Sequence, residues 1–155
     1  MKGLDFSMFS EIRHPPVASV VLGFRREDVA HPLDGFGMLI PKIENFKILG
    51  TIFSSSLFPN RAPENFVTLT TYIGGERHPE LALKAPDELV EIASGDLKIL
   101  LGAKGAPVFQ NVALYPKAIP QYNVGHGKFK DLLNEVEMKT AGLFFAGHFR
   151  DGISL

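Results

Sequence analysis

Five runs of apolar and β-branched residues along the chain are typical of β-strands. The runs cover residues 17–24, 36–40, 46–53, 66–73 and 107–114. A polar turn over residues 42–45 joins the second run to the third, so these two runs form a predicted hairpin. Side chains alternate along a strand, and one face of the fourth run therefore carries Phe66, Thr68, Thr70 and Tyr72.

Two longer stretches have the period of amphipathic helices. The first begins at Pro86, which suits the first helical position, and ends at Gly102. Its predicted buried residues are Leu89, Ile92, Ala93, Leu97 and Leu100, and Gly95 in mid-helix indicates close packing. The second covers residues 128–139, with Phe129, Leu132, Leu133 and Val136 on its apolar face. A short helix is also expected within residues 5–11. The pattern predicts an α+β fold, a mixed, largely antiparallel sheet with about two amphipathic helices packed on it.

The last stretch of the chain, residues 142–155, has a different pattern. Four apolar residues, 143–146, run into Gly147, a polar turn follows over residues 148–151, and Gly152 leads into residues 153–155. We interpret this stretch as a strand, a tight turn and the first residues of a helix. Such turns bring backbone N–H groups close to a ligand, which is often an anion or a cofactor.

Composition excludes several classes of function. The 155 residues suffice for one domain, predicted over residues 1–155, and the net charge of −1 provides no basic surface for nucleic acid. The absence of cysteine removes disulfides and thiolate chemistry, which fits a reducing compartment and a cytoplasmic location. The apolar run at residues 17–24 is too short to span a membrane. The 13 Phe indicate apolar surface that another chain or domain covers.

Two clusters of polar residues resemble a catalytic site and a metal site, but we interpret them as a turn and an exposed loop. The serines of residues 54–56 lack the flanking glycines of a hydrolase nucleophile, so they are assigned to turn formation. Residues 76–80, Glu-Arg-His-Pro-Glu, are assigned to an exposed loop because a third fixed ligand is missing. We therefore expect no catalytic side chain and no metal site.

Six ordered stretches resemble the C-terminal portion of the FAD-dependent protoporphyrinogen oxidases of haem biosynthesis, in the flavin amine oxidase superfamily. They are PPVASVVLGF (15–24), HPLDGFGMLIP (31–41), ILGTIFSSSLFP (48–59), YIGG (72–75), PKAIPQY (116–122) and LFFAG (143–147). The resemblance implies the substrate-binding domain of a larger flavoenzyme that oxidises protoporphyrinogen IX to protoporphyrin IX with FAD and oxygen. The Gly-x-Gly-x-x-Gly turn of the FAD-binding portion is absent from this sequence, so the isolated chain is expected to be inactive.

The resemblance also assigns residues to a flat apolar substrate slot above the flavin. Phe36, Gly37 and Leu39 match the strand that touches the macrocycle, Ile52 matches its hairpin partner, and Tyr72 matches the facing strand. Plain core packing of Phe36, Leu39, Ile52 and Tyr72 is the structural alternative. Hydride transfer to a flavin needs orientation and exclusion of water more than a general base, which agrees with the lack of paired carboxylates.

Contacts to FAD are implied for a second set of positions: Tyr115, Ile119, Gly147, His148, Gly152 and Ile153. Two of them depart from the family pattern. Members typically have Trp where Tyr115 stands and Asn where His148 stands, and the replacements keep an aromatic body and a polar group.

Several partners and alternatives follow from the resemblance. The expected partners are a porphyrinogen substrate and the missing FAD-binding domain of the same protein. The full-length protein is expected to be cytoplasmic or peripheral to the membrane. The alternatives are a coproporphyrinogen-oxidising relative, another flavin amine-oxidase-like enzyme, and a non-enzymatic module that forms a homodimer through an exposed sheet face.

Overall fold

The computed structural model describes residues 5–152, which divide into two compact units. Residues 16–116 form the sheet unit, and residues 5–15 with 117–152 form the helical unit. Each unit is described by itself below. The single domain predicted over residues 1–155 stays a prediction. No helix within residues 5–152 combines the length and the apolar character needed to cross a membrane.

The sheet unit contains five strands in the order β2-β3-β4-β1-β5, and every neighbouring pair is antiparallel. The strands are β1 (Val17–Arg25), β2 (Gly37–Leu39), β3 (Ile48–Ile52), β4 (Phe66–Gly74) and β5 (Phe109–Tyr115). The α+β class, the largely antiparallel sheet and the predicted β2–β3 hairpin are confirmed.

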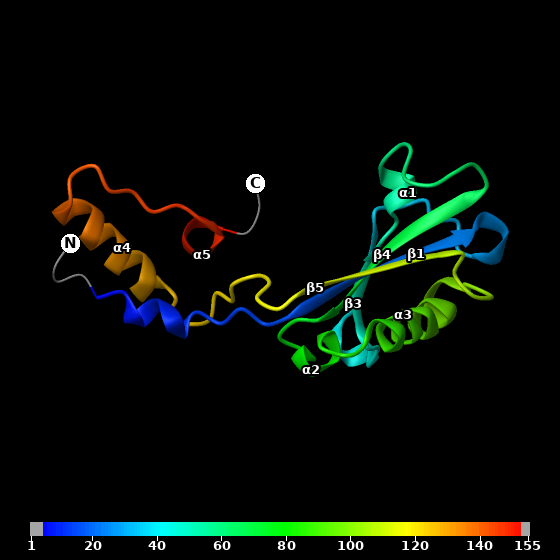
Figure 1. Cartoon of the computed structure of the whole chain (residues 1–155), viewed down its shortest axis with the longest axis horizontal. Helices are drawn as coiled ribbons and strands as arrows, with labels where there is room; N and C mark the ends of the chain where they lie inside the picture. The colour runs from blue at the N-terminus through cyan, green and yellow to red at the C-terminus, as the bar shows by residue number, and fades with distance from the viewer. Residues whose placement is uncertain (1–4, 153–155) are drawn as a thin grey trace. The chain divides into compact units, whose positions relative to one another are not determined.

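One face of this sheet is covered by helix α3 (Pro86–Leu101), as Figure 1 shows. Alternate side chains of β1 and β4 point into the interface and meet one stripe of the helix. The buried set is Ala18, Val20, Leu22, Phe24, Val67, Leu69, Ile73, Leu89, Ala93, Leu97 and Leu101. Thr71 is fully buried among them, and its hydroxyl donates to the Thr51 hydroxyl at 3.1 Å. The predicted amphipathic helix is therefore confirmed as the main cover of the core. Two of its predicted buried residues, Ile92 and Leu100, are only partly buried, and Leu101 is buried instead.

The glycine that follows α3 and the glycine within it have different roles. Gly102 ends the helix with a φ of 62°, and an added Cβ would lie 2.8 Å from the Cβ of Ala30. Gly95 is exposed, and an added Cβ would meet nothing within 4 Å. The interpretation of Gly95 as a close-packing residue is wrong, because its position lies off the buried stripe of the helix.

Two short helices lie next to the strands. Helix α1 (Ser54–Leu57) follows β3 on the side of the sheet away from α3, and α2 (Pro79–Ala82) follows β4. Residues 26–28 and 42–44 form 3₁₀ turns. The serines of residues 54–56, assigned to turn formation from sequence, thus lie in one turn of helix.

The helical unit is held together by phenylalanines. Helix α4 (Gly127–Lys139) buries three of its four predicted residues, Phe129, Leu133 and Val136, and leaves Leu132 half-buried. The Phe9 ring lies 5.9 Å from that of Phe129 and 6.2 Å from that of Phe149, between ring centroids. Phe9 belongs to a 3₁₀ helix over Ser7–Glu11, which fulfils the expectation of a short helix within residues 5–11.

The strand predicted over residues 143–146 does not form. The Phe145 N–H donates to a Glu137 carboxylate oxygen at 2.7 Å, and the Phe145 carbonyl accepts from Arg150 Nη1 at 2.7 Å. These side-chain partners satisfy the backbone groups that a strand would pair in a sheet ladder. A single turn of helix, α5 (His148–Asp151), follows, and the predicted helix start at residues 153–155 lies outside the described residues.

The Glu137–Arg150 pair makes the helical unit sensitive to acid. Arg150 Nη2 donates to Glu137 Oε2 at 3.0 Å, and Arg150 Nη1 bonds to Oε1. The Arg150 guanidinium and the Phe145 N–H hold the pKa of the Glu137 carboxyl below its usual 4.5. Because the pKa of Glu137 is lower in the folded state, its ionised carboxylate stabilises the fold, and this stabilisation is fully present above about pH 4.5. The stabilisation is lost as the pH falls through the lowered pKa.

We therefore expect the protection of the Phe145 amide against hydrogen exchange to fall when the pH is lowered from about 6 to about 3. Exchange followed by NMR measures this loss. Glu137→Gln should already reduce protection at neutral pH and flatten the pH dependence. Asp131→Asn, a change of an exposed acid on the same helix, should leave the dependence as it is. If Glu137→Gln left the pH dependence of Phe145 amide protection unchanged, the assignment of this dependence to the Glu137 carboxylate would be wrong.

Candidate functional site

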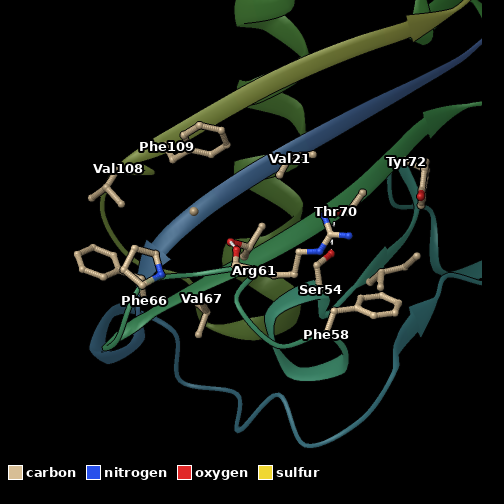
Figure 2. A pocket seen from close by; sticks show the side chains of 14 residues that line it. Val21, Ser54, Phe58, Arg61, Phe66, Val67, Thr70, Tyr72, Val108 and Phe109 are labelled. Carbon is tan, nitrogen blue, oxygen red and sulfur yellow. Dashed lines mark hydrogen bonds between the residues drawn. The ribbon is translucent and has the colours of Figure 1, made fainter.

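The face of the sheet opposite α3 carries a groove of about 810 Å³. Its floor is formed by β4, with Phe66, Thr68, Thr70 and Tyr72 on the predicted face, together with residues of β1 and β5. Figure 2 shows Phe109 and Val108 at one end of the groove and Tyr72 toward the other. This volume is within the range of about 300–1,000 Å³ that is common for small-molecule pockets.

Helix α1 and the loop that follows it border the groove and are tied to β4 by hydroxyl groups. The Ser55 hydroxyl accepts from the Thr68 N–H at 3.0 Å, and the Thr68 hydroxyl donates to the Arg61 carbonyl at 2.8 Å. The hydroxyls of Ser54 and Thr70 bond to each other at 2.7 Å. The serines therefore fix the loop, in agreement with the role in turn formation inferred from sequence.

The predicted substrate positions gather at the β2–β3 side of this face. Ile52 and Tyr72 line the groove itself. In the sheet register Gly37 is opposite Ile52, Leu39 is opposite Gly50, and Gly50 is in turn opposite Tyr72. Four of the five predicted residues therefore share one region of the open face.

Exposure separates these residues from the core. Leu39 is 89% exposed and Phe36, which directly precedes β2, is 69% exposed. Ile52 and Tyr72 are half-buried. Core packing, the structural alternative, therefore does not account for Phe36 and Leu39. Their contact with a substrate stays a prediction.

The predicted flavin contacts are distributed over both units. Tyr115 lies at the end of β5 in the sheet unit, opposite Val17, and is 54% exposed. Ile119, Gly147, His148 and Gly152 lie in the helical unit, and Ile153 is outside the described residues.

Within the helical unit, a groove of about 560 Å³ brings two of these segments together. His14, Lys117, Ala118 and His148 line it, so the chain next to Ile119 faces the same space as His148. Lys117 and the two histidines could bond to polar or anionic groups of a ligand there. No group of three or more His, Asp or Glu residues suited to a metal ion occurs within residues 5–152.

Sequence reasoning missed several residues of the sheet groove. Phe58 and Arg61 come from the loop after α1, Val108 directly precedes β5, and Phe109 is the first residue of β5. The Arg61 guanidinium carbon lies 5.7 Å from the centroid of the Phe58 ring. The available signal was an arginine within an apolar, proline-flanked loop, but its position beside the groove depends on how the loop folds over β4.

The chain belongs to the flavin-containing amine oxidoreductase family, because the model described as "Flavin containing amine oxidoreductase" matches residues 5–152. Among its relatives, a mitochondrial protoporphyrinogen oxidase of Nicotiana tabacum is 43% identical over 148 residues, which are 94% of this chain and 29% of the relative. The coproporphyrinogen III oxidase of Staphylococcus aureus is 33% identical over 121 residues, 78% of this chain and 26% of that enzyme. The chain thus spans less than a third of the length of either relative.

Solved structures agree on the fold. A crystal structure of a protein from Exiguobacterium sp. 255-15 superposes with a TM-score of 0.79 at 19% identity, over 97% of this chain and 33% of that one. Reduced UDP-galactopyranose mutase superposes with a TM-score of 0.69 at 12% identity, over 92% of this chain and 30% of the mutase. The plant relatives are named mitochondrial or chloroplastic, and the cytoplasmic location expected from sequence stays a prediction.

Proposed function

We propose that this chain is the substrate-binding part of a longer FAD-dependent enzyme that oxidises protoporphyrinogen IX. The observation that carries the proposal is the groove on the open sheet face, which is lined by Ile52 and Tyr72 at the positions expected to touch the macrocycle. The similarity to plant protoporphyrinogen oxidases over most of the chain supports the same substrate class. The isolated chain is expected to bind a porphyrin without oxidising a porphyrinogen.

The groove would act by orienting its ligand. Val21, Ile52, Tyr72 and Phe109 offer apolar and aromatic surface to a flat macrocycle and exclude water from it. A bound flavin would supply the acceptor for the hydride, so the residues of the groove need no general base. In the helical unit, Lys117 and His148 would hold polar or anionic parts of the flavin.

The alternative substrate is coproporphyrinogen. The Staphylococcus aureus relative favours it, since that protein is named a coproporphyrinogen III oxidase. The two substrates share the macrocycle and differ in the number of their carboxylates. A comparison of protoporphyrin and coproporphyrin affinities for the chain would therefore distinguish them.

Porphyrin binding to the 155-residue chain tests the proposal. We expect protoporphyrin IX to bind in a fluorescence titration, and Tyr72→Ala to weaken binding about five- to tenfold because an aromatic contact with the macrocycle is lost. Ile52→Ala should weaken binding less. The matched control is Ile99→Ala, which changes an isoleucine that is 72% exposed on α3, and it should leave the affinity unchanged.

Two outcomes would contradict the proposal. Failure of the folded chain to bind protoporphyrin IX would remove the assigned ligand class. Equal affinity of the Tyr72→Ala variant and the unchanged chain would mean that a porphyrin, if bound, does not occupy this groove.

A further inference from the structure

We propose that Arg61 recognises a carboxylate of the ligand that occupies the sheet groove. This inference rests on the function proposed above and assigns a role in it to a residue outside the expected substrate set. Figure 2 shows the Arg61 side chain reaching from its loop toward the part of the groove that holds Ser54 and Thr70.

The positive charge of the groove comes from Arg61. Among the residues that line the groove, Arg61 alone carries a full charge, and the others are apolar, aromatic, hydroxyl-bearing or glycine. No acidic side chain within residues 5–152 forms an ion pair with Arg61. The guanidinium contacts the Phe58 ring, which orients a cation without neutralising it. The groove therefore presents one uncompensated positive charge beside an apolar floor.

The backbone of Arg61 is held in place by a hydrogen bond to β4. Its carbonyl accepts the bond from the Thr68 hydroxyl at 2.8 Å, and the Ser55 hydroxyl bonds the N–H of the same threonine at 3.0 Å. These bonds connect the loop to β4, the strand that forms the groove floor. Ser54 and Thr70 already bond to each other, so the guanidinium is the strongest free donor at this end.

These features define the chemistry of the ligand. An apolar floor binds a flat hydrophobic body, and a guanidinium fork pairs with a carboxylate through two parallel hydrogen bonds. Covering the groove with such a body would lower the local dielectric constant and strengthen the pair. The ligand class is thus an aromatic or porphyrin-like ring that carries a carboxylate near one edge, with the ring against Ile52 and Tyr72.

The experiment compares protoporphyrin IX with its dimethyl ester, which has the same ring and no negative charge. Both are titrated into the 155-residue chain in the same detergent buffer, and binding is followed by fluorescence. We expect Arg61→Gln to weaken binding of the diacid about tenfold and to change binding of the ester by less than about twofold. Arg61→Lys should retain part of the affinity for the diacid, because it keeps the charge and loses the fork.

Arg25→Gln is the matched control. Arg25 is also an exposed arginine on a phenylalanine, with its guanidinium 5.6 Å from the Phe66 ring centroid, but it does not line the groove. Its replacement should change the affinity for either porphyrin by less than about twofold. Circular dichroism of each variant checks that the fold is retained.

The other possible results contradict either the role of Arg61 or the proposed function. If Arg61→Gln weakens the diacid and the ester equally, or weakens neither while Tyr72→Ala weakens both, the role of Arg61 is wrong and the proposed function stands. If Arg25→Gln weakens the diacid as much as Arg61→Gln does, a general surface charge acts in place of a direct contact, and the inference is wrong. If the unchanged chain binds neither porphyrin, the proposed function fails and the role of Arg61 falls with it.

Discussion

Replacement of Phe24 by Ala should lower the free energy of unfolding of the sheet unit by about 3–5 kcal/mol. Phe24 lies on β1, between β4 and β5, and its side chain is 1% exposed in the core beneath α3. The substitution removes buried apolar surface and leaves a cavity that a central strand cannot collapse to fill. Urea unfolding followed by circular dichroism measures the change.

Phe36→Ala is the control for this prediction. Phe36 is 69% exposed, so its removal should change the free energy of unfolding by less than about 0.5 kcal/mol. If the proposed function is correct, the same variant should weaken porphyrin binding. A loss of stability for Phe24→Ala no larger than that for Phe36→Ala would contradict the assigned core.

Replacement of Gly37 by Ala should destabilise the β2–β3 hairpin by about 2–4 kcal/mol. The φ angle of Gly37 is 149°, which L side chains rarely adopt, and an added Cβ would lie 2.2 Å from the Thr51 carbonyl oxygen and 2.9 Å from the Ile52 Cα. Both contacts are with backbone, so a rotamer change cannot relieve them. Because Ile52 lines the groove, the variant should also weaken porphyrin binding if the chain is still folded.

Gly35→Ala is the matched control, two residues earlier in the same segment. An added Cβ at Gly35 would meet nothing within 4 Å, and its φ lies outside the strained range. This variant should unfold at the same urea concentration as the unchanged chain or slightly above it, because Ala restricts the unfolded chain. Equal destabilisation by both substitutions would show that β2 does not approach β3 as closely as described.

Local pattern was sufficient for most of the secondary structure. The helix predicted from Pro86 to its end at Gly102 is observed as Pro86–Leu101, because proline, first-turn acids and a terminal glycine all act within a few residues. The strand predicted over residues 66–73 is observed as Phe66–Gly74, since alternation with period two is a property of the strand itself.

Local pattern failed where distant side chains replace the usual backbone partners. Residues 143–146 have the apolar composition of a strand, but Glu137 and Arg150 bond the backbone of Phe145. Gly95 was expected at a close contact, yet the packing of α3 leaves it in open solvent. Neither outcome can be predicted from the residues next to these positions.

The candidate site was predictable in part. The resemblance placed Gly37, Leu39, Ile52 and Tyr72 near one ligand, and the strand register brings them to one region of the sheet. Arg61 was not predicted to belong to that region, because its place depends on hydrogen bonds between the loop and β4.

The sequence alone therefore determined the class of fold, the main strands and helices, and the family, because these depend on periodicity, caps and ordered motifs. The tertiary structure alone decided which face of the sheet stays open, which residues line its groove, and that Arg61 stands there without an acidic partner among the described residues. Those features arise from the pairing and packing of segments distant in the chain, where contacts far apart in sequence override local preference.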